Sequence, residues 1–185
     1  MFSRKHGVRN SLICGLLALA TFIGIGLAAS AQDLPEPSPE LSEVDFAGFM
    51  DLSSEVFAYR EARLLSLEDF NAFAAEPNTL ILDARSAYAF EMGHIAGAVN
   101  LPFSDFTDEK LAEVIPSKDT RILIYCNNNF SDDVDPIPLK RVSLALNIPT
   151  FINLYGYGYE NIYELAVMTE TANANVNWVS GEIGL

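Results

Sequence analysis

Cys126 is the residue of this 185-residue chain whose type and position best suit covalent chemistry. It comes directly after residues 122–125, an apolar run of strand length. A cysteine at the carboxyl end of a parallel strand lies where open α/β sheets place ligands, with amides of the following loop and helix directed at it. Such amides favour a thiolate or an anionic persulfide, so the position suits a nucleophile. The competing interpretation is a small buried hydrophobic residue at a strand end.

The polar stretch after Cys126 supplies the other candidate site residues. They are Asn127, Asn128, Asn129, Phe130 and Ser131. The three asparagines are expected to donate side-chain hydrogen bonds to a persulfide or to a polar ligand.

Three carboxylates follow in the same loop, at Asp132, Asp133 and Asp135. Close to a thiolate they would raise its pKa and repel an anionic donor. They could instead gather a calcium ion, but Pro136 and Pro138 disturb the register of a calcium-binding loop, which favours a solvated acidic loop. Neither a metal nor a cofactor is predicted, because the chain also lacks an adequate zinc ligand set.

Asp83 and Arg85 are candidate supporting residues, two positions apart at the end of another apolar run. They could hold the loops around Cys126 by charge-assisted hydrogen bonds, or form a structural ion pair with Glu91 as a further partner of Arg85. His94 precedes a tight turn and is expected to be structural rather than catalytic.

Alternating elements must position these residues. Continuous apolar runs of strand length lie at residues 79–82, 121–125 and, less strongly, 150–154. Helices are predicted after the N-cap Ser66 and over residues 86–92, 107–114 and 139–146, with a last element at residues 159–167. The alternation predicts an α/β fold with a mostly parallel central sheet flanked by helices on both faces.

The length allows one sizeable core and is short for two independent domains. The alternating pattern occupies residues 58–167, and residues 44–57 before it could be a helix or a packed arm. Residues 32–43 hold three prolines and four acids and are predicted to be a solvated linker. The polar tail at residues 168–185 either packs one aromatic residue or is loose.

Residues 1–31 have the pattern of a secretory signal. Three basic residues precede the uncharged apolar run at residues 12–29, and residues 29–31 form a small-x-small cleavage site. An uncleaved membrane anchor is the alternative, since the run is near the length that spans a bilayer. Cleavage would remove Cys14 and leave Cys126 as the lone thiol of an exported protein, periplasmic or secreted, in an envelope of bacterial type.

The charge excludes one class of partner. The chain carries 25 acidic and 11 basic residues, a formal charge of −14, and no later stretch gathers enough lysine or arginine to neutralise a phosphate backbone. Nucleic acid is therefore not expected as a partner, and a membrane is expected only if the signal stays uncleaved.

Residues 82–102, LDARSAYAFEMGHIAGAVNLP, resemble the first motif of the rhodanese family: a strand ending in Asp-x-Arg, a short helix, Gly-His-Ile-x-Gly-Ala and Asn-x-Pro. The strand that runs into Cys126 matches the position of the family's sulfur-accepting cysteine. Residues 154–158 are similar to the family's last strand-to-helix turn. The resemblance covers about 110 residues.

The loop departs from the family pattern. It is about twice the usual length and its first basic residues are Lys140 and Arg141, where the family commonly has a basic cradle for anionic donors. The sixth residue after Cys126 is Asp132, so the Cys-x5-Arg phosphate cradle of the related phosphatases is missing and phosphatase activity is not expected.

Three functions remain open. The resemblance implies a sulfane-sulfur carrier or sulfurtransferase that uses Cys126, with a small sulfur donor or a protein thiol as partner. The alternative is a non-catalytic binding module of the rhodanese fold whose loop contacts a protein partner. A third possibility is a thiol redox sensor, which needs an accessible cysteine of low pKa.

Overall fold

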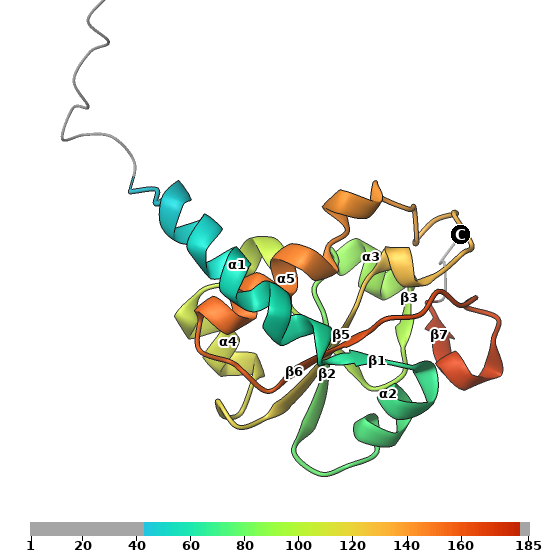
Figure 1. Ribbon diagram of the computed structural model, residues 1–185. Helices are drawn as coiled ribbons and strands as arrows, with labels where there is room; N and C mark the ends of the chain where they lie inside the picture. Colours follow the sequence, from blue (N-terminus) through green and yellow to red (C-terminus); the bar gives the residue numbers. More distant parts are fainter. Residues whose placement is uncertain (1–42, 182–185) are drawn as a thin grey trace, which may run out of the picture. The chain divides into compact units, whose positions relative to one another are not determined.

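The computed structural model describes residues 43–181, and from Val44 onward the chain forms one compact unit (Figure 1). The predicted signal and all of the predicted linker except its last residue lie outside the described residues. Within the described part, no helix is both long and apolar enough to cross a membrane.

A parallel five-stranded sheet forms the centre of the unit. Its strands lie side by side in the order β1 (Leu64–Leu65), β6 (Ile162–Leu165), β5 (Arg121–Tyr125), β2 (Thr79–Asp83) and β4 (Ala98–Asn100). The register places Leu82 opposite Ile124, and Asp83 opposite Tyr125. The predicted mostly parallel α/β sheet is confirmed.

Helices connect and cover these strands. They are α1 (Phe46–Glu61), α2 (Leu67–Ala74), α3 (Ala87–Met92), α4 (Asp108–Val114) and α5 (Asn147–Gly156). Ser66, Ser86 and Thr107 cap α2, α3 and α4 by accepting a backbone N–H of the first turn, and the cap at Ser66 confirms the sequence prediction. Short 3-10 turns lie at η1 (Phe103–Asp105), η2 (Asn127–Asn129), η3 (Val142–Leu144) and η4 (Ala174–Val176).

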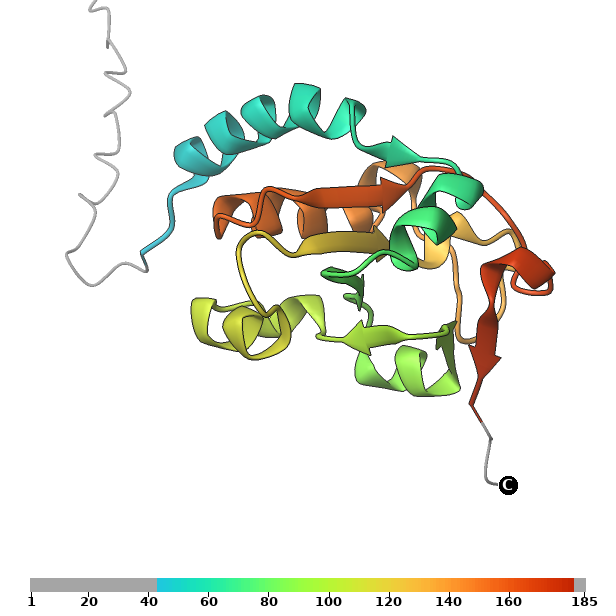
Figure 2. The same cartoon turned by 90° about the horizontal axis from the view of Figure 1, so that it is seen from below.

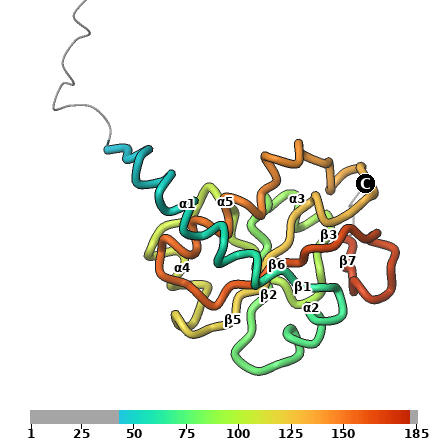
Figure 3. Tube along the Cα trace, in the orientation of Figure 1, coloured from blue at the N-terminus to red at the C-terminus, as the bar shows by residue number. Residues whose placement is uncertain are grey.

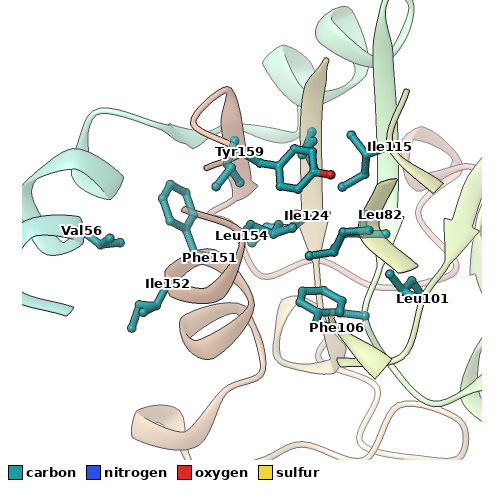
Figure 4. Packing of buried hydrophobic residues seen from close by; sticks show 14 residues of the cluster. Val56, Leu82, Leu101, Phe106, Ile115, Ile124, Phe151, Ile152, Leu154 and Tyr159 are labelled. Carbon is teal, nitrogen blue, oxygen red and sulfur yellow. The ribbon is translucent and has the colours of Figure 1, made fainter. Parts of the chain in front are cut away.

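Alternate side chains of the central strands build a core on each face of the sheet. Leu82, Ile122 and Ile124 point into the cluster formed with α1, α4 and α5 (Figure 4). On the opposite face, Leu123 and Tyr125 pack with α2 and with the segments that follow β5 and β6. Because both faces of the sheet are buried, the sequences of these strands are continuous apolar runs.

Two sequence predictions between β5 and β6 are wrong. Residues 150–154 are not a strand but part of α5, and residues 139–146 hold only the turn η3 instead of a helix. A short apolar run does not separate a buried strand from a buried helix, and Pro149 is compatible with α5 because it lies in the first turn, where its missing N–H has no helical partner. Residues 154–158 consequently end a helix and lead into β6, the reverse of the expected strand-to-helix turn.

Segments at both ends extend the unit. The stretch at residues 44–57 is helical from Phe46 onward, and α1 continues across residue 58 to Glu61. In the tail, β7 (Trp178–Ser180) pairs antiparallel with β3 (Gly93–Ile95) (Figure 2). The side chain of Trp178 packs against the core cluster on this side of the sheet rather than being loose. Figure 3 traces the long segment that joins β5 to α5.

Candidate active site around Cys126

Cys126 follows the last residue of β5 and is buried, with 1% of its surface exposed. Its backbone N–H donates to Oδ1 of Asn129 over 2.8 Å, which fixes the start of the loop against the strand end. The backbone N–H groups of Asn147, Asn128 and Leu146 lower the pKa of the thiol, so each favours the anionic form of the sulfur. The cysteine is a free thiol.

Two of these amides belong to the start of α5. Leu146 is the N-cap of this helix and Asn147 its first residue, so their N–H groups have no carbonyl partner within the helix. The positive end of the helix dipole therefore faces the sulfur, which favours an anion at this point.

Burial and hydrogen bonding act in opposite directions on the thiol. Burial raises the pKa of Cys126 above its ordinary value, the three amides lower it, and the negative charge of Glu164 raises it again. The net pKa is raised. The carboxylate whose charge raises the pKa of Cys126 is thus Glu164 on β6. It is not one of the loop acids that the sequence suggested.

The side-chain amides of the three asparagines hold the loop, and their expected donation to a persulfide or a polar ligand stays a prediction. Asn127 donates to Pro138 O over 3.2 Å, and Asn128 exchanges two hydrogen bonds with the backbone of Lys140. Asn129 donates to Leu165 O at the end of β6 over 2.6 Å. Backbone carbonyls compete successfully for these donors because the loop folds back on itself.

Two of the loop carboxylates are also engaged within the fold. Asp132 accepts from the N–H and the hydroxyl of Thr171, and Asp133 accepts from Leu139 N. Across the described residues, no cluster of three or more acidic, histidine or cysteine side chains could hold a metal ion.

Phe130 and Ser131 anchor the loop to the tail. Phe130 is fully buried and meets the ring of Trp178 edge-on, with centroids 4.9 Å apart. The hydroxyl of Ser131 donates to Thr169 O over 3.2 Å. Residues beyond β6 therefore form the outer wall of the loop.

Asp83 and Arg85 form the predicted ion pair, with 2.6 Å between Nη2 and Oδ2, and both are buried. Arg85 also donates to Asn127 Oδ1 over 3.2 Å, so the pair supports the loop as well. Its further partner is the carbonyl of Gly93, at 2.7 Å, and not Glu91 as the sequence suggested.

His94 has a structural environment, as expected. Its ring stacks on Phe90 with centroids 3.8 Å apart, and Nδ1 lies 2.8 Å from the Phe90 carbonyl.

A cavity of about 240 Å³ lies next to the sulfur. Cys126 and Leu146 line its wall, together with the cations Arg85 and Lys140 and the anion Asp135. Because Arg85 is already paired with Asp83, Lys140 is the cation left to meet a ligand among the residues that line this cavity. The volume suits a small molecule or the tip of a single side chain.

A buried ion pair connected to the site is absent from the sequence predictions. Glu164 is a buried carboxylate in the middle of an apolar strand, and Arg60 of α1 forms an ion pair with it. The signal for Glu164 was present in the sequence, because an acid inside a buried strand requires a partner. Arg60 carried no local signal, since its partner is 104 residues away.

Comparison with known proteins agrees with this geometry. The family model described as "Rhodanese-like domain" matches residues 66–166. The chain is 32% identical over 111 residues to a tRNA uridine(34) hydroxylase of Legionella pneumophila (strain Corby), covering 58% of this chain and 38% of the relative. It is 38% identical over 66 residues to the protein of that name from Sodalis glossinidius, covering 34% of this chain and 18% of the relative.

Among solved structures, the BH2092 protein of Bacillus halodurans aligns with a TM-score of 0.44 and 14% identity, covering 64% of this chain and 77% of that chain. The chain spans well under half the length of the two tRNA uridine(34) hydroxylases that it matches, 38% of one and 18% of the other. The family model nevertheless covers more than half of this chain, and the chain belongs to the rhodanese-like domain family.

Proposed function

We propose that Cys126 carries sulfane sulfur as a persulfide and passes it to a thiol acceptor. The observation that carries this proposal is that Cys126 lines a cavity together with Leu146, the N-cap of α5, whose N–H has no partner within the helix. The backbone amides of Asn147, Asn128 and Leu146 favour the anionic form of the sulfur. Fixed N–H donors stabilise an anionic sulfur without a counter-ion. A structural cysteine at a strand end gains nothing from such donors.

The reaction needs no metal and balances in atoms and electrons. The Cys126 thiolate attacks the outer sulfur of a donor R–S–S⁻, the S–S bond of the donor breaks, and R–S⁻ leaves with its electron pair. The product is the Cys126 persulfide anion. Attack by an acceptor thiolate on the outer sulfur then regenerates Cys126 by the same step.

The cavity supports a small or protein-borne donor. About 240 Å³ is enough for a hydropersulfide group and its carbon stem, and Lys140 offers one positive charge against that of Asp135. The nearly balanced charge gives a dianion such as thiosulfate little attraction.

The relatives named tRNA uridine(34) hydroxylase do not extend the proposal to tRNA. This chain covers only 38% of the Legionella relative, and its charge of −14 opposes binding to a polyanion.

We also propose export of the protein, on the basis of the pattern in residues 1–31. N-terminal sequencing of the mature protein from fractionated cells tests this proposal.

A second candidate, a non-catalytic binding module, is favoured by the burial of the thiol. Cys126 is only 1% exposed, whereas the loop around it exposes Val142, Leu144 and Val134. In this alternative the loop surface is the working part and Cys126 stays inert.

Intact mass spectrometry distinguishes the two functions. The purified protein and its Cys126→Ser variant are incubated with thiosulfate, a small-molecule persulfide and a thiosulfonate. Gain of one sulfur atom by the unchanged protein alone, removable by cyanide, supports the carrier. No gain from any donor, in a folded protein, overturns it and favours the binding module.

A further inference from the structure

Glu164 is a buried charge beside the sulfur site. It lies in β6 between Tyr163 and Leu165, and only 4% of it is exposed. Arg60 of α1 binds it with two parallel hydrogen bonds, 2.6 Å from Nε to Oε2 and 2.6 Å from Nη2 to Oε1. A two-pronged pair of this kind fixes both partners in orientation as well as in charge.

Hydrogen bonds connect this pair to Cys126. The side-chain amide of Asn147 donates to Glu164 Oε1 over 3.1 Å and to Asn129 Oδ1 over 3.2 Å. The backbone N–H of the same Asn147 favours an anion at the sulfur, and Asn129 Oδ1 accepts the backbone N–H of Cys126. Glu164 therefore holds the residue that supplies one of the three amides at the sulfur.

The charges around the sulfur come from three parts of the chain. Glu164 projects from β6, Arg85 from the segment after β2, and Asp135 and Lys140 from the loop. Arg85 is neutralised by Asp83, which leaves the charge of Glu164 to act on the thiol unless Arg60 offsets it. An anion formed at Cys126 would otherwise lie close to a second buried anion, which is costly in a medium of low dielectric constant.

We propose that Arg60 is a positioning residue for Cys126, which it serves by neutralising Glu164 and fixing Asn147 through that carboxylate. The inference rests on the proposed function for its biological meaning, since it describes how the persulfide site is kept anionic. Arg60 lies outside residues 66–166, so the helix that precedes the matched family region completes the site.

A double-mutant cycle tests the inference by the reactivity of the thiol. The rate of Cys126 alkylation by iodoacetamide is measured from about pH 6 to about pH 10, because the thiolate is the reacting species. Four proteins are compared: the unchanged protein, Arg60→Gln, Glu164→Gln and the double variant. Arg60→Lys is added because it keeps the charge.

Arg60→Gln is expected to slow alkylation at neutral pH about tenfold, since it leaves an uncompensated buried carboxylate near the thiolate. Glu164→Gln is expected to accelerate alkylation, because it removes the charge that raises the pKa of Cys126 and keeps an acceptor for Asn147. In the Glu164→Gln background, Arg60→Gln should have no further effect, and Arg60→Lys should restore most of the rate.

Arg121→Gln is the matched control. It removes a comparable arginine–carboxylate pair, Arg121 with Glu76 at 2.6 Å, from the opposite end of β5. Its alkylation profile should equal that of the unchanged protein. Thermal unfolding of every variant checks that it is folded.

The inference is overturned if Arg60→Gln leaves the profile unchanged, or if its effect persists in the Glu164→Gln background, which would mark a merely structural role. Failure of the proposed function is a separate result, because the unchanged protein then takes up no sulfur from any donor. The alkylation rates of the four proteins still report in that case whether Arg60 is coupled to Cys126.

Discussion

The side chain of Asn129 accepts the backbone N–H of Cys126, three residues earlier, and donates to the carbonyl of Leu165 at the end of β6. One side chain therefore joins the ends of two neighbouring strands at the candidate site. Asn129 is 6% exposed, so water cannot easily replace either hydrogen bond.

Replacement of Asn129 by alanine should lower the free energy of unfolding by about 2–3 kcal/mol, because it leaves a buried donor and a buried acceptor unpaired. The matched variant Asn128→Ala should cost only about 1 kcal/mol, since Asn128 is partly exposed and its backbone partners on Lys140 can meet water. Urea unfolding measures both values. Equal costs for the two variants would contradict the bridging role of Asn129.

The raised pKa of Cys126 predicts a shifted alkylation profile. The thiolate reacts, so in the folded protein the rate should still be rising where an ordinary thiol, with a pKa of 9.0, is half ionised. In urea the same cysteine should reach half of its maximum rate near the ordinary value. The comparison uses the same reagent at each pH. A folded profile with its midpoint below the unfolded one would show that the amides outweigh burial.

Gly93 should resist substitution because of its contact with the only tryptophan. A Cβ atom at Gly93 would lie 2.7 Å from Nε1 and 2.8 Å from Cζ2 of Trp178, so Gly93→Ala should displace β7 from β3. The fluorescence of Trp178 should move to longer wavelength, and trypsin or another protease should cut the tail faster.

Gly97→Ala is the control for that substitution. Gly97 has a φ of 81°, and a Cβ atom there would meet nothing within 4 Å. The variant should lose about 1 kcal/mol of stability from backbone strain without a change in fluorescence. Identical spectra for Gly93→Ala and the unchanged protein would contradict the packing described for Trp178.

Local patterns were sufficient to predict much of the fold. The apolar run before Cys126 is β5, Ser66 caps α2 as predicted, and α3 and α4 lie within the predicted helices at residues 86–92 and 107–114. The error at residues 150–154 has a physical cause, since Phe151, Ile152 and Leu154 are all buried in α5. A helix buried on most of its surface has no polar face to reveal its period.

The site was predicted only as far as its local residues. Cys126 and the Asp83–Arg85 pair were found from neighbouring sequence, whereas the Arg60–Glu164 pair and the hydrogen bonds of Asp132 with Thr171 join residues 104 and 39 positions apart. The periodicity of apolar residues in the sequence does not reveal contacts between residues so far apart. The backbone partners of the three asparagines were missed for the same reason, because they become neighbours only after the loop has folded.

The involvement of α1 and β7 bears on any attempt to transplant this site. Residues 66–166 define the family domain, yet a chimera that carried only this stretch would leave Glu164 without Arg60, and Phe130 without Trp178. The graft would lose strand β1 of the sheet, the Arg60–Glu164 ion pair and the Phe130–Trp178 contact. The smallest part of the chain that keeps the whole site is therefore residues 44–181. A protein shortened at either end should still fold but should lose its sulfur chemistry.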